Sequence, residues 1–362
     1  MAELESGYPV GLGKEMNEKR FTLPAVEVSN FVTDINPAFE GRLPLDLKPG
    51  KKSKLGLFLT PRLPKGAFGL EIDRWSHSPS SRAGIIGRAL FSDSDGHPYR
   101  DILEKGGGHH ARSGKEDKDP GMESYHHSVG SLSYRTLSQG SRGICDYPDA
   151  LQDWRVSEKL YRLGIRVPRP IAIIKLNEVV DETGNKISVA EAKERDIIMY
   201  EEEPVVYLRA FGVETRFGAF ISSHPDEKFK LLEDARTFVS QELGTKPEDF
   251  AYDDYLSWLA ETMGKNLALF HKNGFLHFNL RNNHNFTLDG RIVDFDTALE
   301  LQDLNGPVTS HNRIKDFDDA YGSLNFFLNS VIEVSEIKEP IYYPKYLEKF
   351  SRTYSKFFYE PK

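Results

Sequence analysis

Apolar positions recur every three or four residues in the second half of the chain, which is the period of an amphipathic helix. The clearest case is Tyr252–Phe270, followed by Asn273-Gly274 as a helix end. Its apolar stripe consists of Leu256, Leu259, Met263, Leu267 and Phe270. The same period predicts helices over Asp226–Leu243 and Lys315–Val331, and a last helix within residues 335–362.

Short apolar runs separated by turn residues dominate before about residue 210, and these predict strands. They include Gly87–Phe91, Tyr99–Glu104, Val167–Lys175, Asp196–Tyr200 and Pro204–Ala210. One helix is predicted among them, over Pro148–Leu163, and Val179–Lys193 is predicted as a polar turn with a short helix. The long polar segment 109–146 is predicted as a loop.

These elements predict an α+β fold with a sheet-rich N-lobe followed by a helical C-lobe. We expect residues 1–55, which are rich in Pro, Gly and charge, to form an irregular arm. The N-lobe is then residues 56–210 and the C-lobe residues 211–362. A nucleotide is expected in the cleft between two such lobes.

The composition narrows the class of protein. The chain has 362 residues and a formal net charge of −8, which argues against a general nucleic-acid binder. It contains no apolar run of about 18 residues, so no membrane span is expected. The first residues lack a secretory signal, and the single cysteine, Cys145, excludes an internal disulfide. We therefore expect a cytoplasmic protein.

The run from His277 to Ala298 carries the strongest chemical signal. Asn285 and Asp294 offer an amide oxygen and a carboxylate, which are hard ligands suited to Mg²⁺. Two short strand-like runs lie between them, separated by Asp289-Gly290, a dipeptide typical of tight hairpins. Such a hairpin brings the two ligands side by side. A surface hairpin followed by an acidic loop fits the same local pattern.

Basic residues elsewhere suit a phosphate ligand. Lys105 ends a predicted strand and precedes three glycines, which permit close approach of the backbone to an anion. Asp153 on the following helix is the predicted ion-pair partner of Lys105, with Glu158 as the alternative. Arg209 and Arg216 can bind phosphate oxygens in a bidentate manner, although the local sequence by itself favours a surface salt-bridge role for such arginines.

Several motifs in the same order resemble the SelO (selenoprotein O) family of kinase-like protein adenylyltransferases, over about residues 84 to 320. Gly87–Leu90 is similar to the GRAL strand of the family, and Leu103–Gly108 to its LKGxG motif. The segments Ser157–Pro170, Arg209–Phe220 and Gly274–His277 match three further motifs. The seven-residue interval between Arg209 and Arg216 and the nine-residue interval between Asn285 and Asp294 are also those of the family.

The resemblance implies a two-lobed protein-kinase-like fold that transfers AMP from ATP to a hydroxyl side chain of a protein. It implies ATP and Mg²⁺ as cofactors, with Asn285 and Asp294 as the metal ligands and Asp294 also at the nucleotide. It also implies that Lys105 contacts phosphate and pairs with Asp153. The implied nucleotide contacts in the rest of the chain are Gly87, Arg88, Gly143, Arg209 and Arg216.

One departure bears on catalysis. His284 stands where the family has an aspartate that is its presumed general base. A neutral imidazole can accept a proton near pH 7, so His284 is the candidate base. Two other activities remain open from the sequence. One is phosphate transfer to a protein or a small-molecule acceptor, as in a kinase, and the other is nucleotide binding without turnover, as in a pseudokinase.

Overall fold

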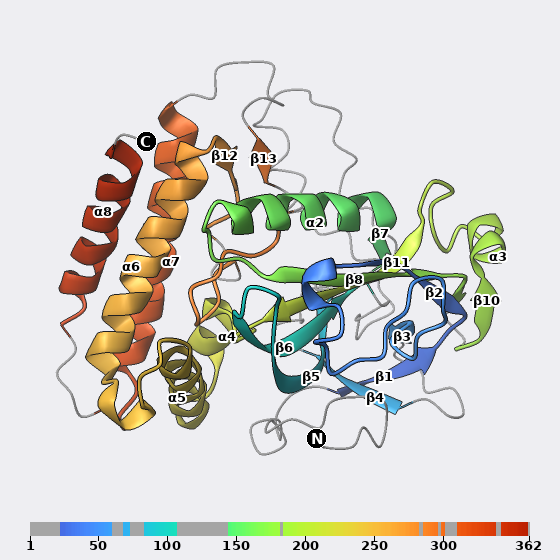
Figure 1. Cartoon of the computed structure of the whole chain (residues 1–362), viewed down its shortest axis with the longest axis horizontal. Helices are drawn as coiled ribbons and strands as arrows, with labels where there is room; N and C mark the ends of the chain where they lie inside the picture. The colour runs from blue at the N-terminus through green and yellow to red at the C-terminus, as the bar shows by residue number, and fades with distance from the viewer. Residues whose placement is uncertain are drawn as a thin grey trace. The chain divides into compact units, whose positions relative to one another are not determined.

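The computed structural model describes residues 22–59, 68–72, 83–106, 144–181, 184–281, 285–295, 298–300, 310–337 and 342–360. The chain divides into two compact units, and each is considered by itself (Figure 1). Unit 1 comprises Met1–Asp95, Asp101–Leu151 and Pro170–Ala210. Unit 2 comprises Gly96–Arg100, Gln152–Arg169 and Phe211–Lys362.

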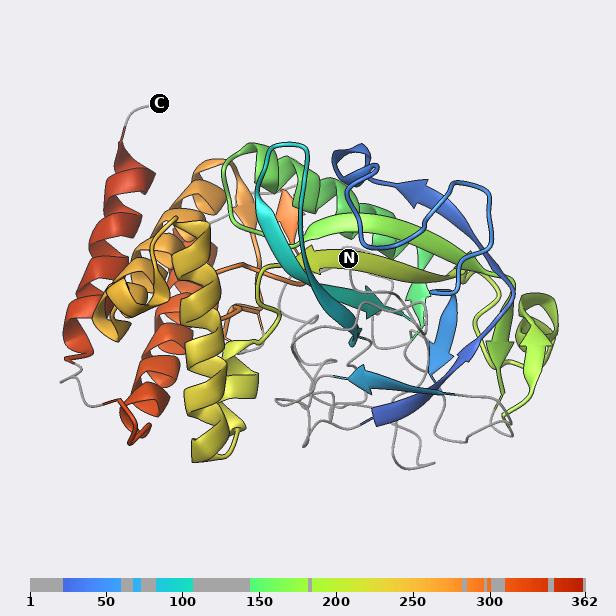
Figure 2. The ribbon, with the colours of Figure 1, turned by 60° about the horizontal axis from the view of Figure 1, so that its bottom comes forward.

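Unit 1 is built on a nine-stranded sheet with the strand order β2-β8-β11-β6-β5-β4-β1-β3, in which β7 also pairs with β11 (Figure 2). These strands are β1 (Thr22–Glu27), β2 (Asn30–Ile35), β3 (Leu57–Leu59), β4 (Phe68–Ile72), β5 (Ala83–Ser92), β6 (Pro98–Lys105), β7 (Cys145–Asp146), β8 (Arg169–Leu176) and β11 (Pro204–Phe211). The pairs β1/β3, β1/β4, β4/β5, β2/β8 and β7/β11 are antiparallel. Strands β8 and β11 are buried along nearly their whole length.

The prediction of an irregular arm over residues 1–55 is wrong for residues 22–35, since β1 and β2 belong to the main sheet. Strand β2 pairs with β8, and the Asn36 Nδ2 group then donates to the Pro170 carbonyl at 2.9 Å. Val32 is buried beneath this pairing. Such partners lie more than 130 residues away in sequence, so local composition did not indicate them.

A small substructure beside the sheet also differs from the prediction. The short helix predicted within Val179–Lys193 forms as α3 (Val189–Glu194), but the residues before it form a hairpin of β9 (Glu178–Val180) and β10 (Lys186–Ser188). The predicted strand Asp196–Tyr200 is instead a series of turns. Asp196 has a φ of 52°, and the Glu202 carboxylate accepts from the Met199 amide at 2.9 Å, so this backbone does not extend.

Unit 2 is mainly helical, and α6, α7 and α8 run side by side in it (Figure 1). Its helices are α2 (Tyr147–Arg162, which begins in unit 1), α4 (Phe217–Ser222), α5 (Pro225–Glu242), α6 (Tyr252–Lys272), α7 (Ser310–Ile332) and α8 (Pro344–Tyr359). Two short strands, β12 (Phe275–Leu276) and β13 (Leu299–Glu300), pair antiparallel. Two 3₁₀ turns complete the described elements, η1 (Pro37–Phe39) in unit 1 and η5 (Pro247–Asp249) in unit 2. The predicted helices therefore all form, with ends shifted by a few residues.

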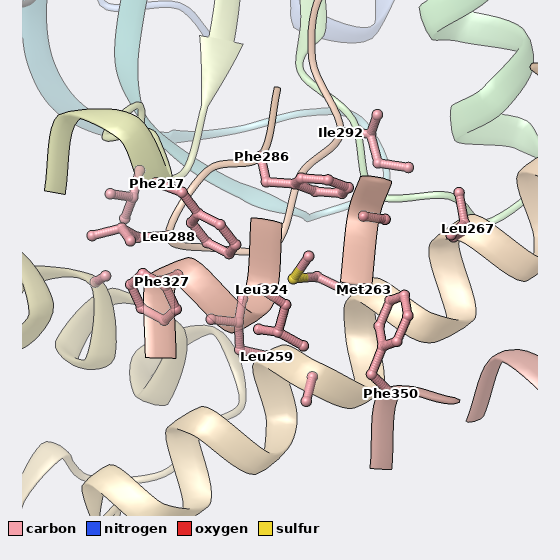
Figure 3. Close-up of a cluster of buried hydrophobic side chains, with 14 of the residues drawn as sticks. Phe217, Leu259, Met263, Leu267, Phe286, Leu288, Ile292, Leu324, Phe327 and Phe350 are labelled. Atoms are coloured by element: carbon pink, nitrogen blue, oxygen red, sulfur yellow. The ribbon is translucent and has the colours of Figure 1, made fainter. Parts of the chain in front are cut away.

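The core of unit 2 joins the helices to residues from the run that carries the predicted metal ligands. Phe286, Leu288 and Ile292 are fully buried and lie against the helical side chains Leu259 and Leu324 (Figure 3). The Phe217 ring stacks on the Phe327 ring with centroids 4.4 Å apart, and it lies 5.9 Å from the Phe286 ring. Burial of large apolar side chains contributes about 1.5–3 kcal/mol each, so this segment is firmly anchored.

The described residues thus form a mixed α+β structure with an antiparallel sheet, as the sequence predicts at this level. The main division after residue 210 coincides with the predicted lobe boundary, but Gln152–Arg169 and Gly96–Arg100 group with the helical unit. Within the part of the chain that is described, no helix is both long and apolar enough to cross a membrane.

Candidate functional site

The predicted hairpin forms in unit 2. The Val293 amide donates to the Asn285 carbonyl at 3.1 Å, which sets the two strands of the hairpin side by side. The turn falls at Asp289-Gly290, and Gly290 has a φ of 76°, a conformation that glycine adopts without strain. Asp294 follows Val293 directly. The backbone therefore brings Asn285 and Asp294 to the same end of the hairpin, as the sequence predicts.

Asp289 is much more than a turn residue. Its buried carboxylate accepts from the Thr287 hydroxyl at 2.5 Å and from the Val213 amide at 3.0 Å. It also pairs with the Arg291 guanidinium and lies 3.5 Å from Arg166 Nη2. A buried charge is tolerated only where ion pairs and hydrogen bonds replace its hydration. Asp289 therefore ties the tip of the hairpin to the chain around it.

Arg166 extends this network. Its Nε donates to the Asp289 carbonyl at 2.6 Å, and its two terminal nitrogens both bond the Glu242 carboxylate, one of them at 2.5 Å. Burial works to raise the pKa of Glu242, but the hydrogen bond and charge of Arg166 outweigh it and lower that pKa. Glu242 is therefore an anion at neutral pH, and it supports the arginine that supports the hairpin.

The loop that precedes the hairpin is fastened to α7. The Asp316 carboxylate accepts from the backbone amides of His277 at 2.7 Å and Phe278 at 2.9 Å. Two helical turns further on, the Ser323 hydroxyl donates to the Leu280 carbonyl at 2.7 Å. Charge-assisted bonds from backbone amides to a buried carboxylate are strong, so the loop has a fixed path along the helix.

The same loop holds the hairpin directly. His277 Nε2 lies 2.8 Å from the Val293 carbonyl, the residue before Asp294. The Asn285 side-chain amide nitrogen donates to the Asn279 carbonyl at 2.6 Å. This bond fixes the orientation of the buried Asn285 amide group through its nitrogen, and its oxygen is the atom suited to a metal.

Arg216 and Asp294 form an ion pair, with Arg216 Nη1 2.9 Å from Asp294 Oδ2. The Arg216 side chain is 14% exposed and that of Asp294 27%. Asp294 also has a φ of 63°, in the left-handed region that a residue with a side chain adopts at a cost of about 1–3 kcal/mol. Strained residues of this kind concentrate at functional sites. Arg216, Asn285 and Asp294 are the predicted site residues that unit 2 brings together.

Four other predicted nucleotide contacts lie in unit 1. Gly87 and Arg88 are on β5, Lys105 is at the end of β6, and Arg209 is on β11, so they occupy neighbouring strands of the sheet. Arg88 Nε lies 3.2 Å from the buried Asp101 carboxylate. All three charged side chains are nearly buried. Buried cations on neighbouring strands are unusual in a sheet, and they mark this part of unit 1 as chemically distinct.

The structure tests the roles of Asp153, His284 and Gly143 less directly. Asp153 is buried on the part of α2 that groups with unit 2, and it accepts from the Ser157 hydroxyl at 3.2 Å. Its pairing with Lys105 would join the two units and stays a prediction. His284 and Gly143 lie outside the described residues.

Glu158, the alternative partner for Lys105, has a partner within its own unit. Its two carboxylate oxygens accept from Arg169 Nε and Nη2, both at 2.9 Å. The Arg169 guanidinium also lies over the Tyr161 ring, 3.7 Å from its centroid. Burial disfavours the charged guanidinium, yet the hydrogen bond and charge of Glu158 raise the pKa of Arg169. The arrangement closes the C-terminal turns of α2 onto the start of β8.

A second group of metal-ligand type lies in the turn between β5 and β6. One ligand atom from each of Asp93, Asp95 and His97 falls within 4.8 Å of the others. The Asp93 carboxylate accepts from the Asp95 amide at 3.0 Å, and His97 Nδ1 lies 2.8 Å from the Tyr161 hydroxyl. These contacts account for the turn as a local hydrogen-bonded structure. This group was not among the site residues predicted from the sequence.

The main residues missed from sequence are Asp316 and the charged partners of Asp289. Asp316 carried a usable signal, because it shares the apolar face of its helix with Ala320 and Leu324. A carboxylate on such a stripe has to meet buried donors. The distant partner of Asp289 carried no signal of that kind, since Arg166 lies more than 120 residues before it.

No protein-family model matches this chain, and a search of curated proteins finds no match either. The chemistry of the site therefore has to be argued from its own residues. In unit 2 these are an amide and a carboxylate on one hairpin and a guanidinium on the segment bridged to it. Together they can hold a divalent cation and a polyanion.

Proposed function

We propose that this protein is an ATP- and Mg²⁺-dependent transferase that moves AMP from ATP to a hydroxyl side chain of a protein. The observation that carries the proposal is the hairpin with Asn285 and Asp294 at one end and the Arg216 guanidinium on Asp294. Amide and carboxylate oxygens suit Mg²⁺, and guanidinium suits phosphate oxygens. The order and spacing of the motifs that resemble the SelO family supply the choice of AMP transfer.

The residues fit the absent groups in their chemistry. Asn285 and Asp294 would hold Mg²⁺, which supplies charge neutralisation at the phosphates of ATP. Asn285 is oriented for this task by its bond to the Asn279 carbonyl, and the neighbouring strand is held by His277. Rigid placement of the ligands is what a charge-stabilising site requires, because reorganisation during reaction then costs little.

The resemblance assigns roles to residues outside this hairpin. Lys105, Arg88 and Arg209 would bind phosphate oxygens, and their burial in unit 1 supports a task other than surface solubility. Asp153 would pair with Lys105. His284 would accept the proton of the attacking hydroxyl and is the candidate base.

Label transfer from ATP tests the proposal. The whole chain is incubated with Mg²⁺, candidate acceptor proteins and ATP labelled at the α- or the γ-phosphate. We expect protein to retain the α-label and pyrophosphate to be released. Retention of only the γ-label would make the chain a kinase. Binding of ATP without either transfer would make it a nucleotide-binding pseudoenzyme, and absence of ATP binding would refute the nucleotide site itself.

Variants at the hairpin make the test specific. Asp294→Asn and Asn285→Ala should each lower α-label transfer by at least about 100-fold, because each removes a metal ligand. Asp226→Asn and Asn329→Ala make the same chemical changes at exposed positions of unit 2 and should retain activity. Thermal unfolding of all four proteins separates loss of the site from loss of the fold.

A further inference from the structure

Arg216 is held by its backbone to the hairpin that carries Asp294. It forms an antiparallel bridge with Thr287, and it is flanked by bonds from the Phe217 amide to the Phe286 carbonyl at 2.9 Å and from the Leu288 amide to the Thr215 carbonyl at 2.8 Å. Arg216 and the hairpin therefore act as one rigid piece. Rearrangement at this place is confined to side chains.

The anchoring extends beyond the backbone bonds. Arg216 is the residue before α4, and the next residue, Phe217, is fully buried between the Phe286 and Phe327 rings. A buried aromatic on each side of the bridge resists displacement of the chain. The guanidinium is different, because it sits at the end of a long flexible side chain and is partly exposed.

The Arg216 guanidinium bonds the carboxylate that is proposed to bind the metal. At 2.9 Å from Asp294 Oδ2, it supplies a positive charge where a divalent cation would bind. Two cations compete for one carboxylate, since each weakens the attraction of the carboxylate for the other. A free divalent ion must therefore displace the guanidinium or share the carboxylate with it. A metal–polyphosphate complex offers the guanidinium other anionic oxygens in exchange.

We propose that Arg216 makes this site selective for a metal–nucleotide complex over the free divalent cation. Arg216 neutralises Asp294 when no nucleotide is bound, and it exchanges Asp294 for phosphate oxygens when metal and nucleotide arrive together. The inference rests on the proposed function, and it adds that the substrate is bound as the metal complex. Arg216 therefore weakens the binding of the free divalent cation and strengthens the binding of the metal–nucleotide complex.

Mn²⁺ titrations by electron paramagnetic resonance test this directly. Mn²⁺ is used alone and then with ATP, on the wild type, Arg216→Met and Arg216→Lys. For Arg216→Met we expect the affinity for free Mn²⁺ to rise about 10-fold, because the competing charge is gone. The affinity for Mn²⁺–ATP should fall at least about 10-fold, because the phosphate contact is gone. Arg216→Lys keeps the charge and should stay near the wild type with free Mn²⁺.

Two controls make the outcome unambiguous. Arg352→Met removes an arginine that is 80% exposed and pairs only loosely with Glu348, at 3.7 Å, so neither affinity should change. Asp294→Asn should abolish the gain when combined with Arg216→Met. If Arg216→Met binds free Mn²⁺ no better than the wild type, the inference is overturned. If wild type binds Mn²⁺ but never ATP, the proposed function fails, and the free-ion titration still decides the role of Arg216.

Discussion

Glu104 offers a sharp test of how unit 1 tolerates a buried charge. It lies on β6 directly before Lys105, it is fully buried, and neither carboxylate oxygen has a hydrogen-bond partner among the described residues. Burial raises the pKa of Glu104 from its ordinary 4.5 to about 8. The group is therefore mostly a neutral acid at pH 7, and it ionises within the pH range of ordinary experiments.

The sign of the effect follows from the two protonation states. The folded protein binds this proton more tightly than the unfolded chain, so the contribution to stability is fully present below about pH 4.5. It decreases as the pH rises and is lost once the pH passes about 8. The difference between 4.5 and about 8, at 1.36 kcal/mol per pH unit, corresponds to about 5 kcal/mol of unfolding free energy. Roughly two-thirds of that is already lost at pH 7.

Glu104→Gln removes the titration while keeping nearly the same shape. The free energy of unfolding is measured in urea at pH 5, 7 and 9, together with hydrogen exchange of the amides of β6, which reports on unit 1. We expect the variant to match the wild type within about 1 kcal/mol at pH 5 and to exceed it by several kcal/mol at pH 9. Glu194→Gln, at an exposed position of α3, is the control and should show no such divergence.

The difference between wild type and Glu104→Gln isolates this group from other titrations, because those are common to both proteins. A difference that stays constant from pH 5 to pH 9 would refute the reasoning. It would mean that the Glu104 carboxylate is solvated or paired, in which case burial does not set its pKa.

Two further predictions concern stability in unit 2. Asp289→Asn should lower the free energy of unfolding by about 3–5 kcal/mol, because it leaves Arg291 and Arg166 with a buried excess of positive charge. Urea unfolding measures this loss, and the control Asp226→Asn should leave the free energy of unfolding nearly unchanged. Gly264→Ala should cost about 1–3 kcal/mol in thermal unfolding, because its Cβ would lie 2.5 Å from the Phe350 carbonyl oxygen where α6 meets α8. Gly322→Ala on α7 is the matched control, since no atom lies within 4 Å of its added Cβ; a loss as large there would show that helical glycine content, not close packing, is responsible.

Local signals predicted the elements of this fold well and its long-range partners poorly. The stripe of α6 and the Asp289-Gly290 turn are visible within a few residues, and both are confirmed. Strand β2 was missed because its pairing partner is β8, and nothing in its own residues indicates that edge. The predicted strand at Asp196–Tyr200 shows the converse error, since this segment forms turns in which Ile198 is buried while Met199 and Tyr200 are exposed.

The candidate site divides in the same way. Asn285 and Asp294 were accessible to sequence reasoning because a two-residue turn dictates their register. Their supports were less accessible: Asp316 could be noticed as a carboxylate on an apolar helical stripe, but its partners could not, and Arg166 reaches the hairpin from a distant segment. Residue type and spacing can therefore identify the ligands of a site, whereas its rigidity depends on contacts that only the folded chain brings together.

The two faces of the hairpin explain why the site can combine rigidity with exchange. Its apolar side chains, such as Phe286, are sealed in the helical core, and its tip is locked by the ion pairs of Asp289. Neither support reaches the end where Asp294 meets Arg216, and the Asp294 side chain of this pair is 27% exposed. Buried pairs resist separation because each partner would be stranded without solvent. A partly exposed pair can part when another ion replaces one member, and that is the property that a site for a metal–nucleotide complex needs.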